Sequence, residues 1–421
     1  MLDLKFIREN AALVKNGIAA KGADDNIDAI LEGDEKRRAL IQEGEGLKAK
    51  RNEVSAQIGK MKKAGEDAAA VIKEMDSVKI RIQEIDEELK VTEEKLNELL
   101  LTVPNIPHPS VPQGKTPDDN QSIFEWGEKR TADFQLRPHW EIIEKLGIID
   151  FERGSKVSGA GFPFYIGKGA MLQRALINFF LDQAAERGYK ELQAPIVVNE
   201  ESARGTGQIP DKEDLMYVAA RDNLYMIPTA EVPVTNFHRK ETFEEKELPV
   251  KYAGYTPCFR REAGSYGKDV RGLNRLHQFD KVELVKFVHP AVSYDELETL
   301  RGDAERLLQL LGLSYRVLLM CTGDMGFTQT KKYDLEVWAP GQQRWLEVSS
   351  CSNFETFQAR RMNIKFKSRE TGKPEFVHTL NGSGLALPRV VAAIIEQYQT
   401  PEGKVVVPKV LHPYTKFTII E

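Results

Sequence analysis

Phe259-Arg260-Arg261-Glu262 is followed, after a glycine-rich connection, by His277-Gln278-Phe279-Asp280-Lys281-Val282-Glu283. The two stretches have the length and composition of neighbouring strands with a flexible loop between them. They gather cations, carboxylates and an aromatic ring in one place, and such side chains on a strand pair favour binding of a charged ligand. We therefore expect the chemical centre of the protein here.

Further strand patterns surround this pair, and few helical patterns separate them. The predicted strands are residues 193–198, 224–227, 255–261, 278–287, 315–320, 333–338 and 345–350. The predicted helices are residues 168–187, 295–311 and 388–399. Many strands with short links predict an α+β fold, in which helices flank an antiparallel sheet.

Size and composition narrow the class of protein. A chain of 421 residues with 41% hydrophobic residues suits a globular protein of two domains. The net charge of −5 excludes a general polyanion binder, so any contact with nucleic acid must be local. The three cysteines, Cys258, Cys321 and Cys351, show no zinc or disulfide spacing, and we expect ordinary core thiols. No apolar run of about 18 residues occurs, so we expect a cytoplasmic protein with no membrane span.

Residues 34–101 carry heptad rows of apolar side chains without a proline. Leu40, Leu47, Val54 and Met61 are spaced by sevens before a break at residues 64–67, and a second set of rows follows it. Two such helices joined by a short turn run antiparallel and pack along these rows. We predict a hairpin coiled coil whose first helix of about thirty residues projects roughly 45 Å.

The two predicted helices differ in charge. Residues 34–63 contain nine Lys and Arg against five Asp and Glu, whereas residues 66–98 contain five against eleven. The basic helix presents a face suited to phosphates, and its candidate contacts are Lys48, Lys50, Arg51, Lys60, Lys62 and Lys63. The alternative is that these charges form salt bridges between the helices and keep the hairpin soluble.

A proline-rich segment, residues 103–112, cannot continue the second helix because proline lacks a backbone donor. We expect an N-terminal domain at residues 1–102, a linker at 103–125 and a second domain at 126–421.

The strand pair lacks the glycine-rich phosphate loops of common nucleotide sites, so side chains must bind any phosphate. Arg260 and Glu262 alternate on the first strand, and Phe279, Lys281 and Glu283 alternate on the second. If these faces coincide, the arginine suits a phosphate, the ring suits a base and a carboxylate suits an amine. The alternative is a sheet surface with cross-strand ion pairs.

Three shorter motifs are ambiguous by themselves. Thr229-Ala230-Glu231 places a hydroxyl and a carboxylate after a strand, and Glu347-Val348-Ser349-Ser350 at a strand end offers oxygen ligands for Mg²⁺. Residues 381–389 resemble a tight glycine turn that opens an apolar helix, with Arg389 in its first turn. A cation at a helix N-terminus opposes the helix dipole, so we expect an anion beside it.

These motifs together resemble the class II aminoacyl-tRNA synthetases, and among them the seryl-tRNA synthetases of the common bacterial type. Motif 1 resembles the helix 172–187 leading to Pro195, motif 2 resembles residues 258–262 with 277–279, and motif 3 resembles residues 382–389. The resemblance covers essentially the whole chain. It implies a class II catalytic domain and an N-terminal arm that binds the variable stem of tRNA.

The resemblance also implies roles for individual residues. Arg260 and Arg389 would be catalytic. ATP would contact Arg260, Glu262, Leu276, Phe279, Glu347, Val348, Ser349, Ser350 and Arg389. Glu347 and Ser350 would hold Mg²⁺. L-serine would contact Thr229, Ala230, Glu231, Arg260, Glu283 and Ser383.

The implied enzyme is an ATP-dependent, AMP-forming ligase that makes seryl adenylate and charges tRNA-Ser, together with tRNA-Sec where that RNA is present. The resemblance further implies a homodimer. A paralogue that loads an amino acid onto a carrier protein, or a coiled-coil scaffold without activity, is the alternative. The loop at residues 207–214 differs in sequence from the one usual in this family. The cysteine and histidine pattern does not fit the family's zinc-dependent form.

Overall fold

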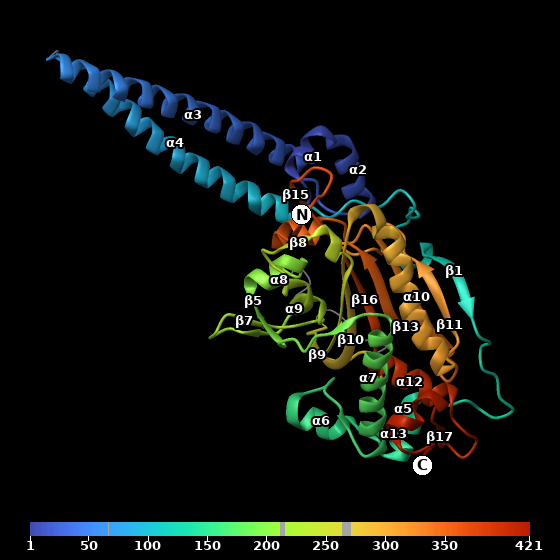
Figure 1. Cartoon of the computed structure of the whole chain (residues 1–421). Coiled ribbons are helices and arrows are strands. Elements are labelled where there is room, and N and C mark those ends of the chain that lie inside the picture. Colours follow the sequence, from blue (N-terminus) through green and yellow to red (C-terminus); the bar gives the residue numbers. More distant parts are fainter. Residues whose placement is uncertain (66, 211–214, 263–270) are drawn as a thin grey trace. The chain divides into compact units, whose positions relative to one another are not determined.

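A computed structural model describes residues 1–65, 67–210, 215–262 and 271–421 (Figure 1). The chain divides into two compact units. One comprises residues 1–19 and 23–104, and the other comprises residues 20–22 and 105–421. Each unit is described by itself.

The first unit is helical. Short helices α1 (Leu4–Glu9) and α2 (Ala11–Ala20) precede the long helices α3 (Ile27–Ala64) and α4 (Ala69–Thr102). Gly65 ends α3 in the left-handed conformation with φ 74°, which glycine adopts without steric cost. The predicted helical hairpin is confirmed, as Figure 1 shows.

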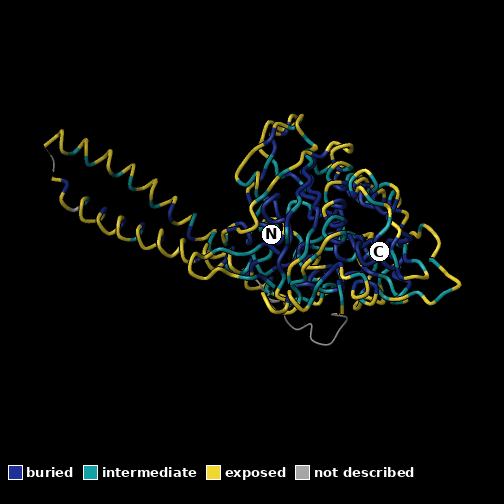
Figure 2. The backbone as a smooth tube through the Cα atoms, turned by 90° about the horizontal axis from the view of Figure 1, so that it is seen from below, coloured by how far each residue is buried: buried dark blue, intermediate teal, exposed yellow. Residues whose placement is uncertain are grey.

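The predicted length of the first helix was too short. Helix α3 has 38 residues, roughly 57 Å at 1.5 Å per residue, because Ile27 and Ile30 extend its apolar row into a small core with α1 and α2. Along the hairpin the inward positions are buried or half-buried, and most of the others are exposed (Figure 2). The buried apolar residues of the hairpin seam are Leu40, Met75, Val78, Ile82, Ile85 and Leu96.

The second unit is built on an eight-stranded sheet in the order β1-β11-β12-β13-β16-β10-β9-β4. Every neighbouring pair is antiparallel except β4 with β9. The strands are β1 (Gln121–Trp126), β4 (Lys190–Glu191), β9 (Val250–Phe259), β10 (Gln278–Val288), β11 (Tyr315–Leu319), β12 (Lys331–Ala339), β13 (Arg344–Asn353) and β16 (His378–Ala386). The α+β prediction is confirmed.

Helices and smaller sheets surround this sheet. The helices are α5 (His139–Leu146), α6 (Phe151–Ser158), α7 (Lys168–Glu186), α8 (Glu200–Thr206), α9 (Glu231–Asn236), α10 (Ser293–Leu311), α11 (Phe357–Met362), α12 (Leu387–Gln397) and α13 (His412–Thr415), with 3₁₀ turns at Pro117–Asp119, Glu245–Glu247, Pro290–Val292 and Lys409–Leu411. The short strands are β2 (Ile149–Asp150), β3 (Phe164–Tyr165), β5 (Val197–Asn199), β6 (Val218–Ala219), β7 (Leu224–Met226), β8 (Thr242–Glu244), β14 (Lys365–Lys367), β15 (Pro374–Phe376), β17 (Val405–Val406) and β18 (Ile419–Ile420).

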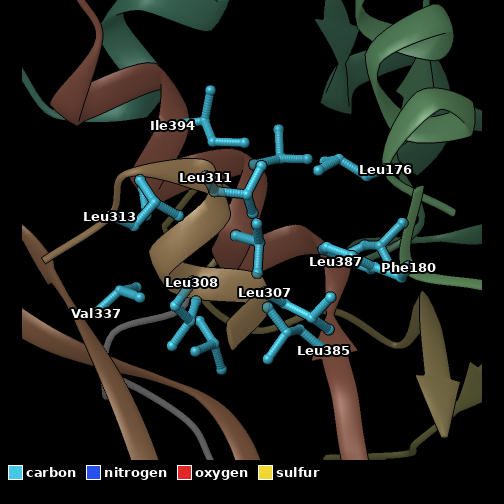
Figure 3. Packing of buried hydrophobic residues seen from close by; sticks show 14 of the residues in the cluster. Leu176, Phe180, Leu307, Leu308, Leu311, Leu313, Val337, Leu385, Leu387 and Ile394 are labelled. Atoms are coloured by element: carbon cyan, nitrogen blue, oxygen red, sulfur yellow. The ribbon is translucent and has the colours of Figure 1, made fainter. Parts of the chain in front are cut away.

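One face of the large sheet is covered by α7, α10 and α12, which enclose the main core. Figure 3 shows Leu307, Leu308 and Leu311 of α10 among side chains from α7, α12 and the sheet. Truncating one of these buried leucines to alanine costs about 2–5 kcal/mol. Strand β10 alternates, so Val282 and Leu284 enter this core while Val285 and Phe287 pack on the other face with α9 and α11. That other face carries the candidate site.

Two local predictions were wrong. Residues 381–384 form no glycine turn, because they lie inside the central strand β16. A Cβ on Gly382 would lie 3.0 Å from Leu300 Cγ, and a Cβ on Gly384 would lie 3.1 Å from Leu284 Cγ, so the glycines admit close packing. The predicted strand 193–198 is confined to β5 (Val197–Asn199), since Pro195 cannot donate to a ladder.

Candidate active site

A polar cavity of about 440 Å³ is lined by side chains of β10, β13 and β16 and by the first turn of α12. Most of the predicted site residues line it. They are Thr229, Glu231, Arg260, Glu262, Leu276, Phe279, Glu347, Val348, Ser350, Ser383 and Arg389. Three predicted residues do not line it, namely Ala230, Glu283 and Ser349, all of which are buried. The structure therefore brings together predicted residues from Thr229 to Arg389, which are far apart in the chain.

Arg260 and Glu262 line the cavity, but they do not lie on a strand as predicted. Strand β9 ends at Phe259, and Glu262 has a positive φ of 51°, so strand alternation does not orient these two side chains. The guanidinium of Arg260 lies 5.1 Å from the ring centroid of Phe279, a cation–π distance. Glu262 pairs with Arg275 at 3.2 Å. The cation and the ring are thus in contact, and the carboxylate lines the same cavity.

Glu283 is the centre of a buried polar cluster behind residues that line the cavity. Its carboxylate accepts hydrogen bonds from Thr229 Oγ1 at 2.8 Å, Asn381 Nδ2 at 2.9 Å and Ser383 Oγ at 3.3 Å. Lys281 forms an ion pair with it and donates to Thr229 Oγ1 at 2.9 Å. Glu283 is 0% exposed, and its partners Thr229, Lys281 and Ser383 face the cavity. Phe279, Lys281 and Glu283 share a face, as strand alternation predicts.

Glu231 lies near this cluster, at the start of α9. Gln358 Nε2 donates to its Oε1 at 2.6 Å. Burial, followed by the neighbouring Glu283 carboxylate, raises the pKa of Glu231 to about 7. A carboxyl whose pKa is near 7 and which lines a cavity is suited to pair with an ammonium group that enters there.

Arg389 also lines the cavity and lies in the first turn of α12, as predicted. Its Nη1 donates to the carbonyl of Glu347 at 2.8 Å and its Nε to the carbonyl of Asn274 at 3.2 Å. The Glu347 carboxylate lies 3.7 Å from the same guanidinium. These contacts aim a fixed positive charge at the cavity, where it suits an anion.

Glu347 and Ser350 lie inside β13, which corrects the prediction of a strand end. The register between β12 and β13 shifts, pairing Leu335 with Ser349 and Glu336 with Glu347, so Val348 has no partner. This bulge lets Glu347 and Ser350 both line the cavity. The neighbouring Asp334 has a buried Oδ1 without a hydrogen-bond partner. The oxygen donors fit a Mg²⁺ ion that shares its coordination with phosphates.

Several residues at the site were not assigned a role from the sequence. Lys281 and Asn381 bind Glu283, and Gln358 binds Glu231. The alternation of β10 placed Lys281 on the same face as Glu283 without giving it a role, and correct assignment of β16 as a strand could have identified Asn381. The position of Gln358 depends on packing of α11, for which the sequence carries no signal.

Parts of the predicted loops are outside the described residues. These are residues 211–214 of the loop 207–214 and residues 263–270 of the connection between β9 and β10. A second cavity of about 870 Å³ is lined by Trp140, Phe151 and several arginines, and it shares Glu262, Arg275 and Leu276 with the first.

The candidate RNA contacts on α3 divide into two groups. Lys48 pairs with Asp86 at 2.9 Å and Lys50 with Glu74 at 2.6 Å, as the salt-bridge alternative expects. Among the described residues, no acidic partner forms an ion pair with Arg51, Lys60, Lys62 or Lys63. The unpaired cations therefore gather toward the tip of the hairpin.

The described residues also bear on the predictions for cysteines, metal sites and membrane spans. The three cysteines are free and buried. Among the residues with coordinates, no group of three or more His, Cys, Asp and Glu could hold a metal ion, and no helix is long and apolar enough to cross a membrane.

Comparison with known proteins decides the family. Residues 1–107 match the seryl-tRNA synthetase N-terminal domain, and residues 217–398 match the tRNA synthetase class II core domain (G, H, P, S and T). Serine–tRNA ligase of Salinibacter ruber is 57% identical over 424 residues, which cover 100% of this chain and 99% of the relative. The chain belongs to the seryl-tRNA synthetase family.

Two further relatives agree with this assignment. The Geobacter sulfurreducens serine–tRNA ligase is 55% identical, with 98% of each chain covered. The crystal structure of seryl-tRNA synthetase from Pyrococcus horikoshii complexed with ATP has a TM-score of 0.95 at 39% identity, covering 100% of this chain and 99% of that one. The predictions of the seryl-tRNA synthetase family, its fold class and a serine–tRNA ligase are confirmed, and neither the carrier-protein nor the scaffold alternative is favoured.

Proposed function

We propose that this seryl-tRNA synthetase family member activates L-serine with ATP in the 440 Å³ cavity and transfers the serine to tRNA-Ser. The observation that carries the proposal is that one cavity is lined by a carboxyl that suits an ammonium group, Glu231, and by a cation that suits a phosphate, Arg389. The Pyrococcus horikoshii relative was crystallised with ATP, which supports ATP as the co-substrate.

ATP occupies the end of the cavity formed by motif 2 and α12. Its adenine stacks on Phe279 and its amino group faces Glu262, while Leu276 and Val348 supply apolar contacts. Arg260 binds the α-phosphate and Arg389 binds the γ-phosphate of a bent nucleotide. Ser349 is buried and donates to the carbonyl of Ser383 at 2.6 Å, so its contribution is to support the strand.

Glu347 and Ser350 would hold Mg²⁺ beside the phosphates, where a bound ion would supply neutralisation of phosphate charge. The lining residues supply the rest of the nucleotide contacts.

L-serine occupies the other end. Its ammonium pairs with Glu231, and its hydroxyl reaches the cluster of Thr229, Ser383 and Glu283, with Ala230 as packing behind them. Alanine has no hydroxyl to bond with this cluster, and a site built to hydrogen-bond a substrate hydroxyl rejects an analogue that lacks it by about 10⁴-fold. Threonine carries an extra methyl group, and we propose that it is excluded by a lack of room beside this cluster.

The reaction needs no protein nucleophile. The serine carboxylate attacks the α-phosphorus in line, pyrophosphate leaves and seryl adenylate forms. The terminal ribose hydroxyl of tRNA then attacks the serine carbonyl and AMP leaves. Arg260 and Arg389 orient the phosphates and neutralise developing charge, which are the main contributions a protein makes to such a transfer.

Residues 1–102 form the tRNA-binding domain, residues 103–125 the linker and residues 126–421 the catalytic domain. Arg51, Lys60, Lys62 and Lys63 bind RNA phosphates from the arm, and Lys48 and Lys50 contribute once their ion pairs exchange. These exposed pairs are worth about 0–1 kcal/mol each, so a phosphate can displace them.

A second copy of the chain packs against α7, giving a homodimer in the cytoplasm. The exposed outer side of α7 supports this assignment, because a cavity of about 660 Å³ there is lined by Ile177, Leu181 and Ile196. Ile196 and Val197 are 38% and 39% exposed, and a partner would cover them.

Exchange of labelled pyrophosphate into ATP, run with each of the twenty amino acids, tests the activation step. Serine alone should support rapid exchange, and charging of a tRNA-Ser transcript should follow. Exchange with another amino acid, or none with serine, would overturn the proposal.

A further inference from the structure

His139 and Glu396 form a buried pair that takes no part in the reaction. His139 is the first residue of α5, Glu396 lies near the end of α12, and both are 0% exposed. The imidazole Nδ1 lies 2.8 Å from Glu396 Oε1, and the backbone N–H of His139 donates to the same oxygen at 2.9 Å. A charged group buried this deeply is retained only where its partners compensate for lost water.

The rest of the Glu396 carboxylate is also occupied. Its Oε2 accepts from the backbone N–H groups of Gly341 at 2.9 Å and Gln342 at 3.3 Å. Gln342 Nε2 donates to Oε1 at 2.7 Å. The carboxylate is therefore surrounded by donors from α5 and from the turn between β12 and β13.

The contact on the other side of the ring fixes its protonation. The backbone N–H of Leu273 lies 2.9 Å from His139 Nε2. A backbone N–H can only donate, so Nε2 carries no proton and Nδ1 donates its proton to Glu396. The neutral ring thus holds Leu273 on one edge and Glu396 on the other.

Gly272 shows how closely the chain approaches this ring. It has φ +66°, and a Cβ at this position would lie 2.3 Å from His139 Nε2. Only glycine fits both the conformation and the contact. The segment 272–274 is therefore seated directly on the imidazole.

This segment is part of the nucleotide end of the cavity. Leu273 and Asn274 line the cavity, and the carbonyl of Asn274 accepts from Arg389 Nε at 3.2 Å. Asn274 Nδ2 also donates to Gln342 Oε1 at 2.8 Å. A continuous chain of hydrogen bonds therefore runs from the buried pair through the segment to Arg389.

We propose that His139 and Glu396 are positioning residues for the nucleotide: they hold the segment 272–274 so that Asn274 orients Arg389 toward the phosphates. His139 does not touch ATP and acts only through this segment. The inference rests on the proposed function, because it assigns Arg389 to ATP.

The test compares His139→Phe with His139→Gln. Phenylalanine keeps the ring volume but removes both nitrogens, whereas the glutamine amide can still accept from Leu273. We expect KM for ATP in serine-dependent pyrophosphate exchange to rise about tenfold in His139→Phe, the equivalent of one lost hydrogen bond. The rise in His139→Gln should be about threefold, and KM for serine should change less than about twofold in both.

A core variant, Leu307→Ala, matched for its loss of Tm, is the control for general destabilisation and should leave KM for ATP unchanged. Where His139→Phe does not fold, Gln342→Leu interrupts the same chain from a half-buried position and should also raise KM for ATP. An unchanged KM for ATP in a folded variant, or an equal rise in KM for serine, would overturn the inference. Absence of exchange in the unmodified protein would instead overturn the proposed function.

Discussion

The strongest prediction concerns the buried pair of Lys281 and Glu283. Glu283→Gln keeps the volume of the side chain but removes its charge, which leaves Lys281 at 6% exposure without a counter-ion. Breaking a buried pair in this way costs about 3–5 kcal/mol of unfolding free energy. The double variant Glu283→Gln with Lys281→Met removes both charges, so it should recover stability to within about 1 kcal/mol of the unmodified protein.

Activity should not recover with stability. Thr229 and Ser383 lose the carboxylate that accepts their hydroxyl protons in both variants, so serine-dependent pyrophosphate exchange should fall by at least about 10²-fold in each. ATP affinity should hold within about threefold, because the nucleotide end does not depend on this cluster. Urea unfolding, exchange kinetics and calorimetric titration with ATP measure the three quantities. Recovery of exchange in the double variant, or parallel loss of ATP binding, would refute the reasoning.

Three more predictions follow from the same geometry. Because the pKa of Glu231 is raised to about 7, the folded state binds more protons than the unfolded state between about pH 4.5 and 7. The contribution of Glu231 to the unfolding free energy therefore falls as the pH rises through that range. Urea unfolding of Glu231→Gln should show no such fall, and a pH profile of stability identical to that of the unmodified protein would contradict this prediction. Arg389→Gln should lower kcat/KM for ATP by about 10²-fold with KM for serine little changed, measured by exchange kinetics; a change in serine KM alone would count against the assignment. Replacing Lys60, Lys62 and Lys63 by glutamine should weaken tRNA binding and reduce the dependence of its affinity on salt, while pyrophosphate exchange stays unaltered. The control removes the same number of lysines from α4, and an equal loss of tRNA affinity in the control would contradict the assignment of the arm.

Sequence patterns predicted the parts of the molecule that depend on local repetition. The heptad rows that include Leu40 in α3 and Met75 in α4 specify the hairpin, because a regular helix brings residues seven apart onto one face. Alternation in β10 placed Phe279, Lys281 and Glu283 on one face for the same reason. The residues of the cavity were identified from the family resemblance, and the fold explains how they meet.

The remaining features depend on packing between distant segments. Gly382 and Gly384 resemble a turn in sequence, and only contact with Leu300 and Leu284 gives their actual role in a central strand. The bulge at Val348 is visible only in the register with β12. His139 resembles an ordinary helix start until Leu273 is found on its other edge.

A crystal structure with a non-hydrolysable seryl-adenylate analogue tests the central claim most directly. We predict the adenine on Phe279, the sulfamoyl group that replaces the phosphate at Arg260, and the serine ammonium within hydrogen-bond distance of Glu231. The analogue bound in the 870 Å³ cavity beside Trp140, or with its serine end away from Thr229 and Glu231, would contradict the account.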